Sequence, residues 1–474
     1  MISARPLPEW IVLAGATLAL SGCAVGPNYK PPMTPPTAAG PFVSTAPSSA
    51  ATQAVPDDWW RLYNDPVLDR LVREALAEND DLKVAAANLA NAQAMVSEAR
   101  AGLFPSTDLT AGANYGKSST TSSSTSGNRA QPGWFYSTGF TAAYQVDLFG
   151  QIRRSIEAAK ANAEAQEAAE NAVRVTVAAE TAAAYANVCG FAEQAAVARH
   201  SLQVVQQNYD ITVRQRDAGA LSDFDVARQA TLLEQARAAI PTFDGQRRAA
   251  LFELTALLGK TPAEAPADAA ACQTPPRLAQ PLPVGDGAAL LKRRPDVREA
   301  DRQLASATAK IGVAVASLYP SVSLGGAINA GATRPSQIFH NSSISYSVGP
   351  LISWTFPNTL VALAQIREAR ATASGTLASF DSTVVQALKE TEQALTTYAA
   401  ELDRHAALTA ARDRANEALR LANIQYQAGT ASFLDLLTTE TTVVTADQQL
   451  AASDQLLSSD QVAVFQALGG GWQE

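Results

Sequence analysis

Residues 135–148 read FYSTGFTAAYQVDL, and residues 343–356 read SISYSVGPLISWTF. In both stretches every second residue is mostly apolar or aromatic, and the residues between them are mostly small or polar. This alternation is typical of a transmembrane β-strand with one face toward lipid and the other toward water. A half-buried sheet of a soluble protein alternates in the same way. The length of the strands and the aromatic residues near their ends favour the membrane.

Two further segments, 105–116 and 320–332, alternate more weakly and complete a set of four predicted strands. Four strands cannot close a barrel, since the smallest known membrane barrels have about eight strands. An open edge would leave unpaired backbone groups in lipid. Several copies of the chain must therefore share one barrel. Two copies would leave little lumen, so a pore favours a trimer with twelve strands.

The predicted order of helices and strands occurs twice along the chain. Leu-Phe-Pro at 103–105 returns as Leu-Tyr-Pro at 318–320, and the turn at 219–225 returns at 429–435. This period of about 210 residues is too long for a solenoid repeat. Each half is predicted to contain a helix, a strand, a loop, a strand, a very long helix, a turn and a last helix.

The long helices are expected at about 150–217 and 361–428, because neither range contains a proline. A helix of roughly 65 residues is about 100 Å long. Within the first range, small and apolar residues step alternately by four and three, which indicates a close-packed heptad seam. These residues are Ala184, Val188, Phe191, Ala195, Ala198, Leu202, Val205 and Tyr209. A tube that extends far from the membrane explains such lengths, and a solid coiled-coil stalk is the alternative.

Each long helix ends at a glycine, Gly219 or Gly429, and the next helix opens with Ser-x-x-Asp. The simpler interpretation of Ser222 with Asp225, and of Ser432 with Asp435, is a capping box at the start of a helix. The second interpretation is that the turns converge on the tube axis and their side chains close it. A ring of carboxylates there would favour cations. The candidates for this constriction are Asp223, Phe224, Asp225, Leu434 and Asp435.

The N-terminus has the pattern of a bacterial lipoprotein. Residues 1–22 form a predicted signal peptide, and Leu20-Ser21-Gly22-Cys23 resembles a lipobox, which predicts a lipidated Cys23, palmitate included. Ala24 stands where an Asp commonly directs retention in the inner membrane, so outer-membrane sorting is favoured. The Pro/Ala/Ser/Thr-rich segment 23–56 is expected to be a tether, wrapped on the body or loose. Regular structure is expected to begin near Trp59.

Composition excludes several function classes. The net charge of −9 argues against a nucleic-acid partner. Three His with three Met leave little material for a metal centre, and no cofactor is predicted. The sequence contains no Gly-x-Ser-x-Gly elbow, and no enzyme is predicted. An oxidising compartment would permit a bond between Cys189 and Cys272. Nothing in the sequence brings the two together, so we expect them to be unpaired.

Two blocks resemble a known family. Cys23-Ala-Val-Gly-Pro-Asn-Tyr-Lys-Pro-Pro32 is similar to the mature start of the lipoprotein outer-membrane efflux factors of the OprM/NodT type, relatives of TolC. Arg293-Arg-Pro-Asp-Val-Arg298, followed by Ile311-Gly-Val313, resembles the family's most recognisable block. The resemblance implies a mixed helical and transmembrane-β fold, in which a homotrimer forms a twelve-stranded barrel in the outer membrane and a twelve-helix periplasmic tunnel. It also implies an exit duct for drugs or other small toxic compounds.

As partners the resemblance implies a periplasmic adaptor, or membrane fusion protein, and an inner-membrane pump of the resistance-nodulation-division class. The chain departs from the family at the gate. Where the family often has an Asp and an Arg, Thr438 and Thr441 stand here. We therefore expect Leu434, beside Asp435, to be the main hydrophobic constriction. A duct for type I protein secretion, metal-ion efflux and a structural coiled-coil lipoprotein remain alternatives.

The expected domain order follows from these patterns. The signal peptide (1–22) and the lipidated tether (23–56) precede a first efflux repeat at 57–270. A linker at 271–285 leads to the second efflux repeat at 286–474.

Overall fold

The computed structural model describes residues 24–33, 36–44, 50–51, 55–117, 132–278, 281–357 and 359–472. The predicted signal peptide and Cys23 lie outside these ranges. The short elements are η1 (Pro36–Ala38), β1 (Ala50–Ala51), η2 (Trp59–Tyr63), η3 (Pro262–Glu264), α6 (Ala267–Ala270), β4 (Leu282–Pro283), α7 (Gly287–Arg293), η4 (Pro335–Gln337) and η5 (Asn341–Ser343). The longer helices are α2 (Pro66–Glu78), α3 (Asp80–Ala101), α4 (Gln151–Asp217), α5 (Asp223–Leu257), α8 (Pro295–Ala316), α9 (Leu360–Gln427) and α10 (Phe433–Ala467). The longer strands are β2 (Ser106–Gly116), β3 (Gly133–Val146), β5 (Ser321–Ala332) and β6 (Ile344–Ser353).

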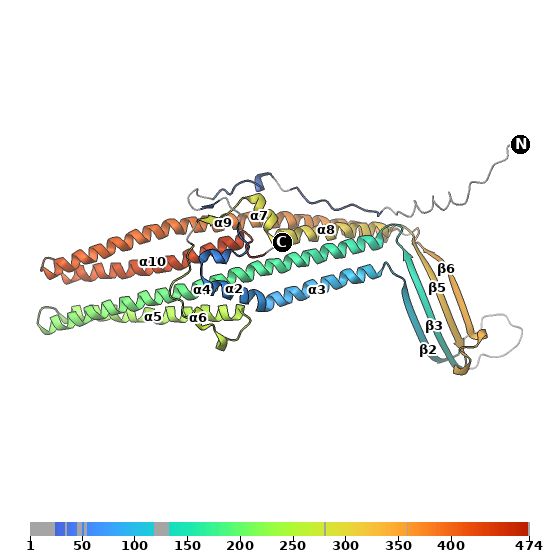
Figure 1. The fold of residues 1–474 in the computed structure, drawn as a ribbon, viewed down its shortest axis with the longest axis horizontal. Coiled ribbons are helices and arrows are strands. Elements are labelled where there is room, and N and C mark those ends of the chain that lie inside the picture. Colours follow the sequence, from blue (N-terminus) through green and yellow to red (C-terminus); the bar gives the residue numbers. More distant parts are fainter. Residues whose placement is uncertain are drawn as a thin grey trace. The chain divides into compact units, whose positions relative to one another are not determined.

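The two halves of the chain repeat one order of elements. The first half runs α3, β2, β3, α4 and α5, and the second runs α8, β5, β6, α9 and α10 (Figure 1). The second helix pair matches the first in length, since α4 and α9 have 67 and 68 residues and α5 and α10 have 35 each. The predicted succession of helix, strand, strand, long helix and last helix is therefore present twice.

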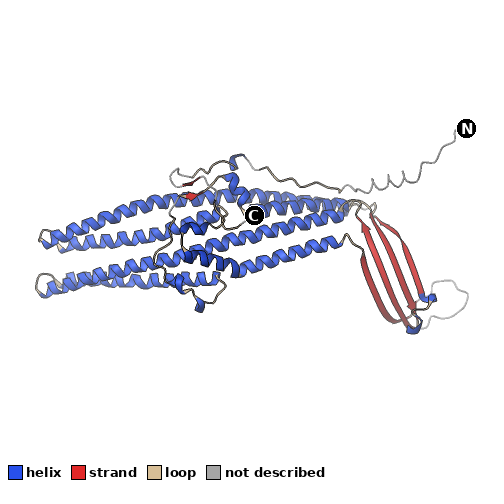
Figure 2. Ribbon diagram, viewed as in Figure 1, coloured by secondary structure: helices blue, strands red, loops and turns tan. Residues whose placement is uncertain are grey.

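The chain divides into two compact units. The sheet unit comprises the described residues of 1–32, 89–166 and 300–380. Its four strands form one antiparallel sheet in the order β2-β3-β5-β6, shown in red in Figure 2. The two hairpins meet where β3 pairs with β5, so one sheet is built from both halves of the repeat.

The core unit comprises the described residues of 33–88, 167–299 and 381–474. Here α4 runs beside α5, with an Arg199–Asp244 ion pair at 2.6 Å, and α9 runs beside α10 (Figure 1). A large hydrophobic core lies where the short α2 meets these helices. At its centre Trp59, fully buried, stacks on Phe465 with 4.6 Å between ring centroids.

Regular structure begins earlier than the sequence predicted. The helix η1 and the strand β1 both precede Trp59, and β1 pairs in parallel with β4. Phe42 and Val55 are buried in the core unit, and the backbone N–H of Val43 donates to Glu392 at 2.7 Å. The expectation that ordered elements begin only near Trp59 was wrong, because backbone pairing with a distant segment does not require an apolar sequence pattern.

The expectation of unpaired cysteines was also wrong. Cys189 of α4 and Cys272 form a disulfide with an S–S distance of 2.11 Å and a Cα–Cα distance of 5.0 Å. The segment that follows Cys272 is held against α10, since Ser458 donates to the carbonyl oxygen of Pro276 at 2.8 Å and Arg277 pairs with Asp454. These contacts join residues far apart in sequence, which is why spacing did not reveal the bond.

Candidate functional site

The sheet presents one continuous apolar row across all four strands. Leu109 is opposite Phe140, Phe140 is opposite Ile328, and Ile328 is opposite Tyr346. Their side chains are 77%, 45%, 56% and 83% exposed. Exposed large apolar side chains in register indicate a surface that faces lipid rather than water.

The next residues along the strands form a row on the opposite face. Thr110 is opposite Gly139, Gly139 is opposite Asn329, and Asn329 is opposite Ser345. This row contains only small or polar residues, and successive side chains of a strand point to opposite faces. The sheet therefore has one apolar and one polar face, as the wall of a water-filled barrel requires.

Aromatic side chains gather near the strand ends. Tyr115 and Trp134 lie at the end of the first hairpin, with 5.5 Å between ring centroids. Trp354 and Phe356 follow β6 and stack at 4.7 Å. Aromatic girdles of this kind are found where a membrane barrel meets the headgroup region.

Both turns between the long helix pairs have the same backbone. Gly219 and Gly429 adopt the left-handed conformation, with φ of 77° and 72°. In each turn the residue after the glycine donates its N–H to the carbonyl five residues earlier, at 2.8 Å from Ala220 and 2.9 Å from Thr430. This hydrogen bond closes the helix end in the manner of a Schellman motif, in which glycine is preferred.

The predicted capping boxes are present at both turns. Ser222 and Asp225 satisfy each other's backbone N–H groups, with the Ser222 N–H 3.1 Å from the carboxylate. Ser432 and Asp435 repeat the arrangement, also at 3.1 Å. The serine hydrogen bonds lower the pKa of both aspartates. Both carboxylates are therefore ionised at neutral pH, and each accepts a hydrogen bond from the backbone N–H of its capping serine.

The other candidate gate residues are exposed at the turns. Phe224 and Leu434 are 69% and 47% exposed. Asp223 forms an exposed ion pair with Arg216 at 3.0 Å, and the Arg228 guanidinium lies over the Phe224 ring at 5.7 Å. The first turn thus combines charges with an aromatic ring.

Two threonines, Thr438 and Thr441, stand where the resemblance would place an Asp and an Arg. The hydroxyl of Thr438 donates to the backbone of Leu434, and that of Thr441 to the backbone of Leu437, each at 2.8 Å. Both hydroxyls are occupied within α10. Near the turns, the two hairpins are joined by a hydrogen bond between α9 and α4, in which Tyr426 donates to Gln215 at 2.9 Å.

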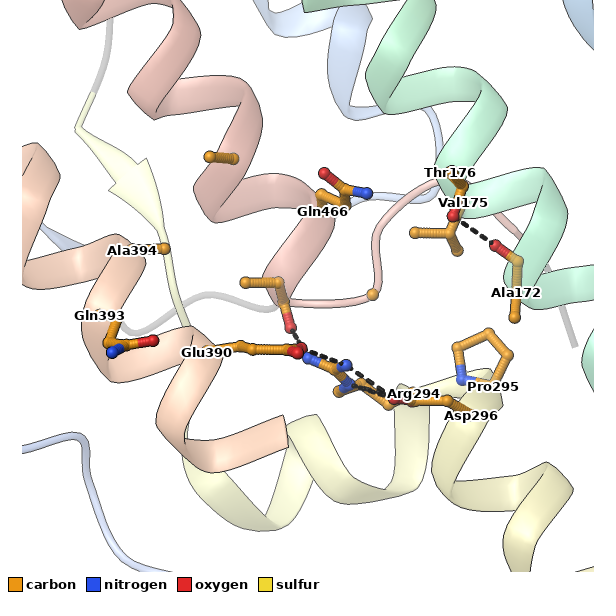
Figure 3. Close-up of a pocket in the computed structure, with 13 residues that line it drawn as sticks. Ala172, Val175, Thr176, Arg294, Pro295, Asp296, Glu390, Gln393, Ala394 and Gln466 are labelled. Atoms are coloured by element: carbon orange, nitrogen blue, oxygen red, sulfur yellow. Dashed lines mark hydrogen bonds and ion pairs between the residues drawn. The ribbon is translucent and has the colours of Figure 1, made fainter. Parts of the chain in front are cut away.

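The Arg-Arg-Pro-Asp block contacts α9 and the end of α10, and Figure 3 shows Arg294 with Asp296 and Glu390. Arg294 is buried and pairs with Asp296 at 2.7 Å and with Glu390 of α9 at 2.8 Å. It also donates to the carbonyl of Ala467 at the end of α10. These residues line a cavity of about 440 Å³ whose charges are already paired. The role of the block is therefore structural, because it joins the start of α8 to α9 and to the end of α10.

The start of the tether is docked in the sheet unit. Arg154 of α4 donates to the carbonyl of Val25 at 3.1 Å and to the Asn28 side chain at 2.7 Å. Gly26 meets Gly312 so closely that a Cβ on Gly26 would lie 2.5 Å from the Gly312 Cα. The backbone crossing therefore requires a glycine at position 26, while a Cβ on Gly312 would lie 2.8 Å from the Arg154 side chain.

The sequence analysis missed two buried polar residues. Gln229 of α5 and Glu440 of α10 are 0% and 8% exposed and line one cavity. A signal for Glu440 was present, since it lies three residues after Leu437 and four before Val444 on one helical face. An acid on an apolar face is unusual. No comparable pattern marks Gln229.

Within the described residues, no cluster of three or more His, Cys, Asp or Glu could hold a metal ion. In the same part of the chain, no helix has the length and apolar character needed to cross a bilayer.

Comparisons with known proteins agree with this geometry. The model of the family described as "Outer membrane efflux protein" matches residues 71–260 and 288–470. The chain is 30% identical to Nodulation protein T of Rhizobium leguminosarum bv. viciae, over 96% of this chain and 92% of that protein. It is also 30% identical to the "Probable efflux pump outer membrane protein TtgC" of Pseudomonas putida, over 98% and 95%.

Solved structures of outer-membrane channels have the same fold. The outer-membrane channel OprN matches with a TM-score of 0.88 and 34% identity, over 95% of this chain and 100% of that one. The open state of the Neisseria gonorrhoeae MtrE channel matches with a TM-score of 0.80 and 25% identity, over 95% and 98%. The chain therefore belongs to the outer membrane efflux protein family, and the TolC-like fold, the outer-membrane location and the role as an efflux duct that its sequence predicted are confirmed.

Proposed function

We propose that three copies of this chain form one duct, in which each copy contributes four strands to a shared twelve-stranded barrel. The observation that carries the proposal is the open sheet with an apolar face and with β2 and β6 at its edges. In lipid each unsatisfied backbone group costs several kcal/mol, so these edges need partners. Two chains would give eight strands, which leave little lumen, and three chains give twelve.

The duct conducts drugs or other small toxic compounds passively from the periplasm to the exterior. Its partners are a periplasmic adaptor of the membrane fusion class and an inner-membrane pump of the resistance-nodulation-division class, which supplies the energy. The names of relatives support small-molecule cargo, among them an antibiotic efflux pump protein and a toluene efflux pump protein, both of Pseudomonas putida and 30% identical to this chain. The two matched segments support efflux repeats at 57–270 and 286–474, joined by the linker 271–285.

Cys23 is the lipidation site that anchors the trimer to the outer membrane. The docked tether supports this assignment, because Val25 donates its N–H to the carbonyl of Phe149 at 3.1 Å, directly before α4. Phe149 in turn stacks on Tyr319 at 4.5 Å, next to the start of β5. The chain that follows Cys23 is thus tied to the residues that join strands to helices.

The gate lies at the turns, where Leu434 forms a ring of apolar side chains around the axis and Asp435 lies beside it. Phe224, Asp223, Asp225 and Thr438 contribute to the same constriction. Leu434 is 47% exposed in the single chain, so its side chain is available to pack against the same residue of the other copies, which supports this role.

Light scattering on detergent-extracted protein, corrected for bound detergent, tests the shared barrel. We expect a protein mass of three chains. A stable monomer in mild detergent would leave the edges of the sheet open and contradict the duct. The cargo is tested separately by the susceptibility of a deletion strain to antibiotics, detergents and metals. Sensitivity to metals alone would overturn the proposed drug cargo.

A further inference from the structure

Three helices of the core unit line a partly open cavity of about 260 Å³ near the turns. One face of α4, one of α5 and one of α10 contribute the lining. The residues that line it are Ala198, Ser201, Val205, Gln229, Leu232, Gln235, Ala236, Ala239, Leu437, Glu440, Thr441, Val444 and Gln448. Most of these side chains are small or apolar, so the polar ones stand out.

Gln229 is fully buried in this lining, at 0% exposure. Neither its amide nitrogen nor its amide oxygen has a hydrogen-bond partner among the residues that the structure describes. A buried amide without partners costs about 1–3 kcal/mol, and buried side-chain polar atoms are normally satisfied. The cavity therefore offers one donor and one acceptor to a molecule inside it.

Glu440 lies on the α10 side of the same cavity and is 8% exposed. It has no ion-pair partner within the described ranges of the chain. Burial raises the pKa of its carboxyl to about 7, and the neighbouring Asn208 acts in the opposite direction. A positive charge beside this carboxylate would relieve its desolvation.

The chemistry of the lining distinguishes among ligands. A single carboxylate with an amide does not suit Ca²⁺ or Mg²⁺, which take six or more oxygen ligands. Water or a bare ion would make no favourable apolar contact with the side chains of Val205, Leu232 and Val444. A small molecule with an apolar body and one cationic end satisfies both parts.

We propose that this cavity binds a small organic ammonium compound, whose charged nitrogen donates to the Glu440 carboxylate and the Gln229 amide oxygen and whose apolar body lies among the alanine, valine and leucine side chains. Such a compound would join α5 to α10, the two helices that follow the turns. Leu437 of the cavity is one helical turn from Leu434. The inference goes beyond the proposed duct and does not depend on it, because binding is measured on the isolated channel.

The test is calorimetric titration of the full-length, detergent-extracted protein with n-hexylamine at pH 8, where Glu440 is ionised. The alcohol 1-hexanol, of equal chain length and without charge, is titrated in parallel. We expect hexylamine to bind at least tenfold more tightly than hexanol. We expect Glu440→Gln to abolish that preference, because the substitution keeps the shape and removes the charge.

Glu234→Gln is the matched control, since Glu234 lies on α5 and is exposed in a pair with Arg237. This variant should bind hexylamine as the unmodified chain does, which separates the site from general attraction to acidic surface. Ala236→Leu keeps both polar residues and fills the cavity, and it should weaken binding tenfold. Equal binding of the two probes, or unchanged binding in both Glu440→Gln and Ala236→Leu, would overturn the proposal.

Discussion

The turn at Gly219–Asp225 and the turn at Gly429–Asp435 share a backbone and differ in their side chains. Both have a left-handed glycine, the same closing hydrogen bond and a Ser–Asp capping box. The first turn adds Asp223 in an ion pair and Phe224 under an arginine. The second adds Leu434. Both halves of the repeat therefore share the glycine, the hydrogen bond and the capping box that reverse the chain direction. The side chains exposed at the tip differ between the two halves.

Leu434→Ala tests the largest expected difference between the turns. If Leu434 is the main constriction, its truncation should widen the pore and raise single-channel conductance in a bilayer several-fold. Entry of vancomycin into cells that carry the variant should rise in parallel. Phe224→Ala at the equivalent position of the first turn should change both readouts much less. Unchanged conductance and vancomycin entry in Leu434→Ala would disprove the assignment.

Gly219→Ala and Gly429→Ala test whether the shared backbone matters equally in both turns. Beyond the neighbouring residues of the chain, a Cβ at either site would meet no heavy atom within 4 Å, so only the left-handed conformation opposes the substitution. That conformation costs a non-glycine residue roughly 1–2 kcal/mol. Amide hydrogen exchange at each turn should accelerate about tenfold. Acceleration at one turn only would show that the two backbones are not equivalent.

Ser222→Ala and Ser432→Ala remove the caps and should have a smaller effect on the first turns of α5 and α10. Loss of a capping serine costs typically about 1 kcal/mol. The effect has a pH dependence, because the cap lowers the pKa of Asp225 and Asp435. A carboxyl with a lowered pKa in the folded state stabilises the fold above its ordinary pKa, and this contribution is lost as the pH falls below about 4.

Hydrogen exchange measured against pH separates the caps from other effects. Protection at the start of α5 and α10 should decrease in the unmodified chain as the pH drops below about 4, relative to the middle of each helix. In the serine variants this decrease should be smaller, since the hydrogen bond to the carboxylate is already absent. An identical pH profile in the variants would contradict a role for the capping boxes.

Arg216→Ala tests the smallest difference, the ion pair that only the first turn has. Arg216 and Asp223 are both exposed, and exposed pairs contribute little. We expect less than a twofold change in hydrogen exchange at Gly219 and no change in conductance. A large change in conductance would instead assign the gate to the first turn.

Much of the fold was predictable because it follows local periodicity. Alternation by two located the ends of β3 and β6 to within three residues, and the absence of proline located α4 and α9. Ser222 with Asp225 and Ser432 with Asp435 formed the predicted capping boxes. Helix ends and strand faces depend on neighbours within a few residues, which a sequence shows directly.

The candidate site was predictable only in part. The sequence marked Leu434 and Phe224 by their position at the turns, and both are exposed there. It did not reveal that the Tyr426 hydroxyl of α9 donates to Gln215 of α4. Nor did it point to Gln229. These facts depend on which side chains of different helices meet.

The sequence by itself determined the repeat, the two-faced strands, the long helices, the capped turns and the family. Only the tertiary structure decided that Cys189 bonds to Cys272, that the tether crosses at Gly26 and Gly312, and that Gln229 and Glu440 face one cavity. The physical reason is the range of the interactions. Periodicity in the sequence reflects interactions within one helix or strand. The contacts named here join segments separated by up to hundreds of residues, and they form only when the helices pack together.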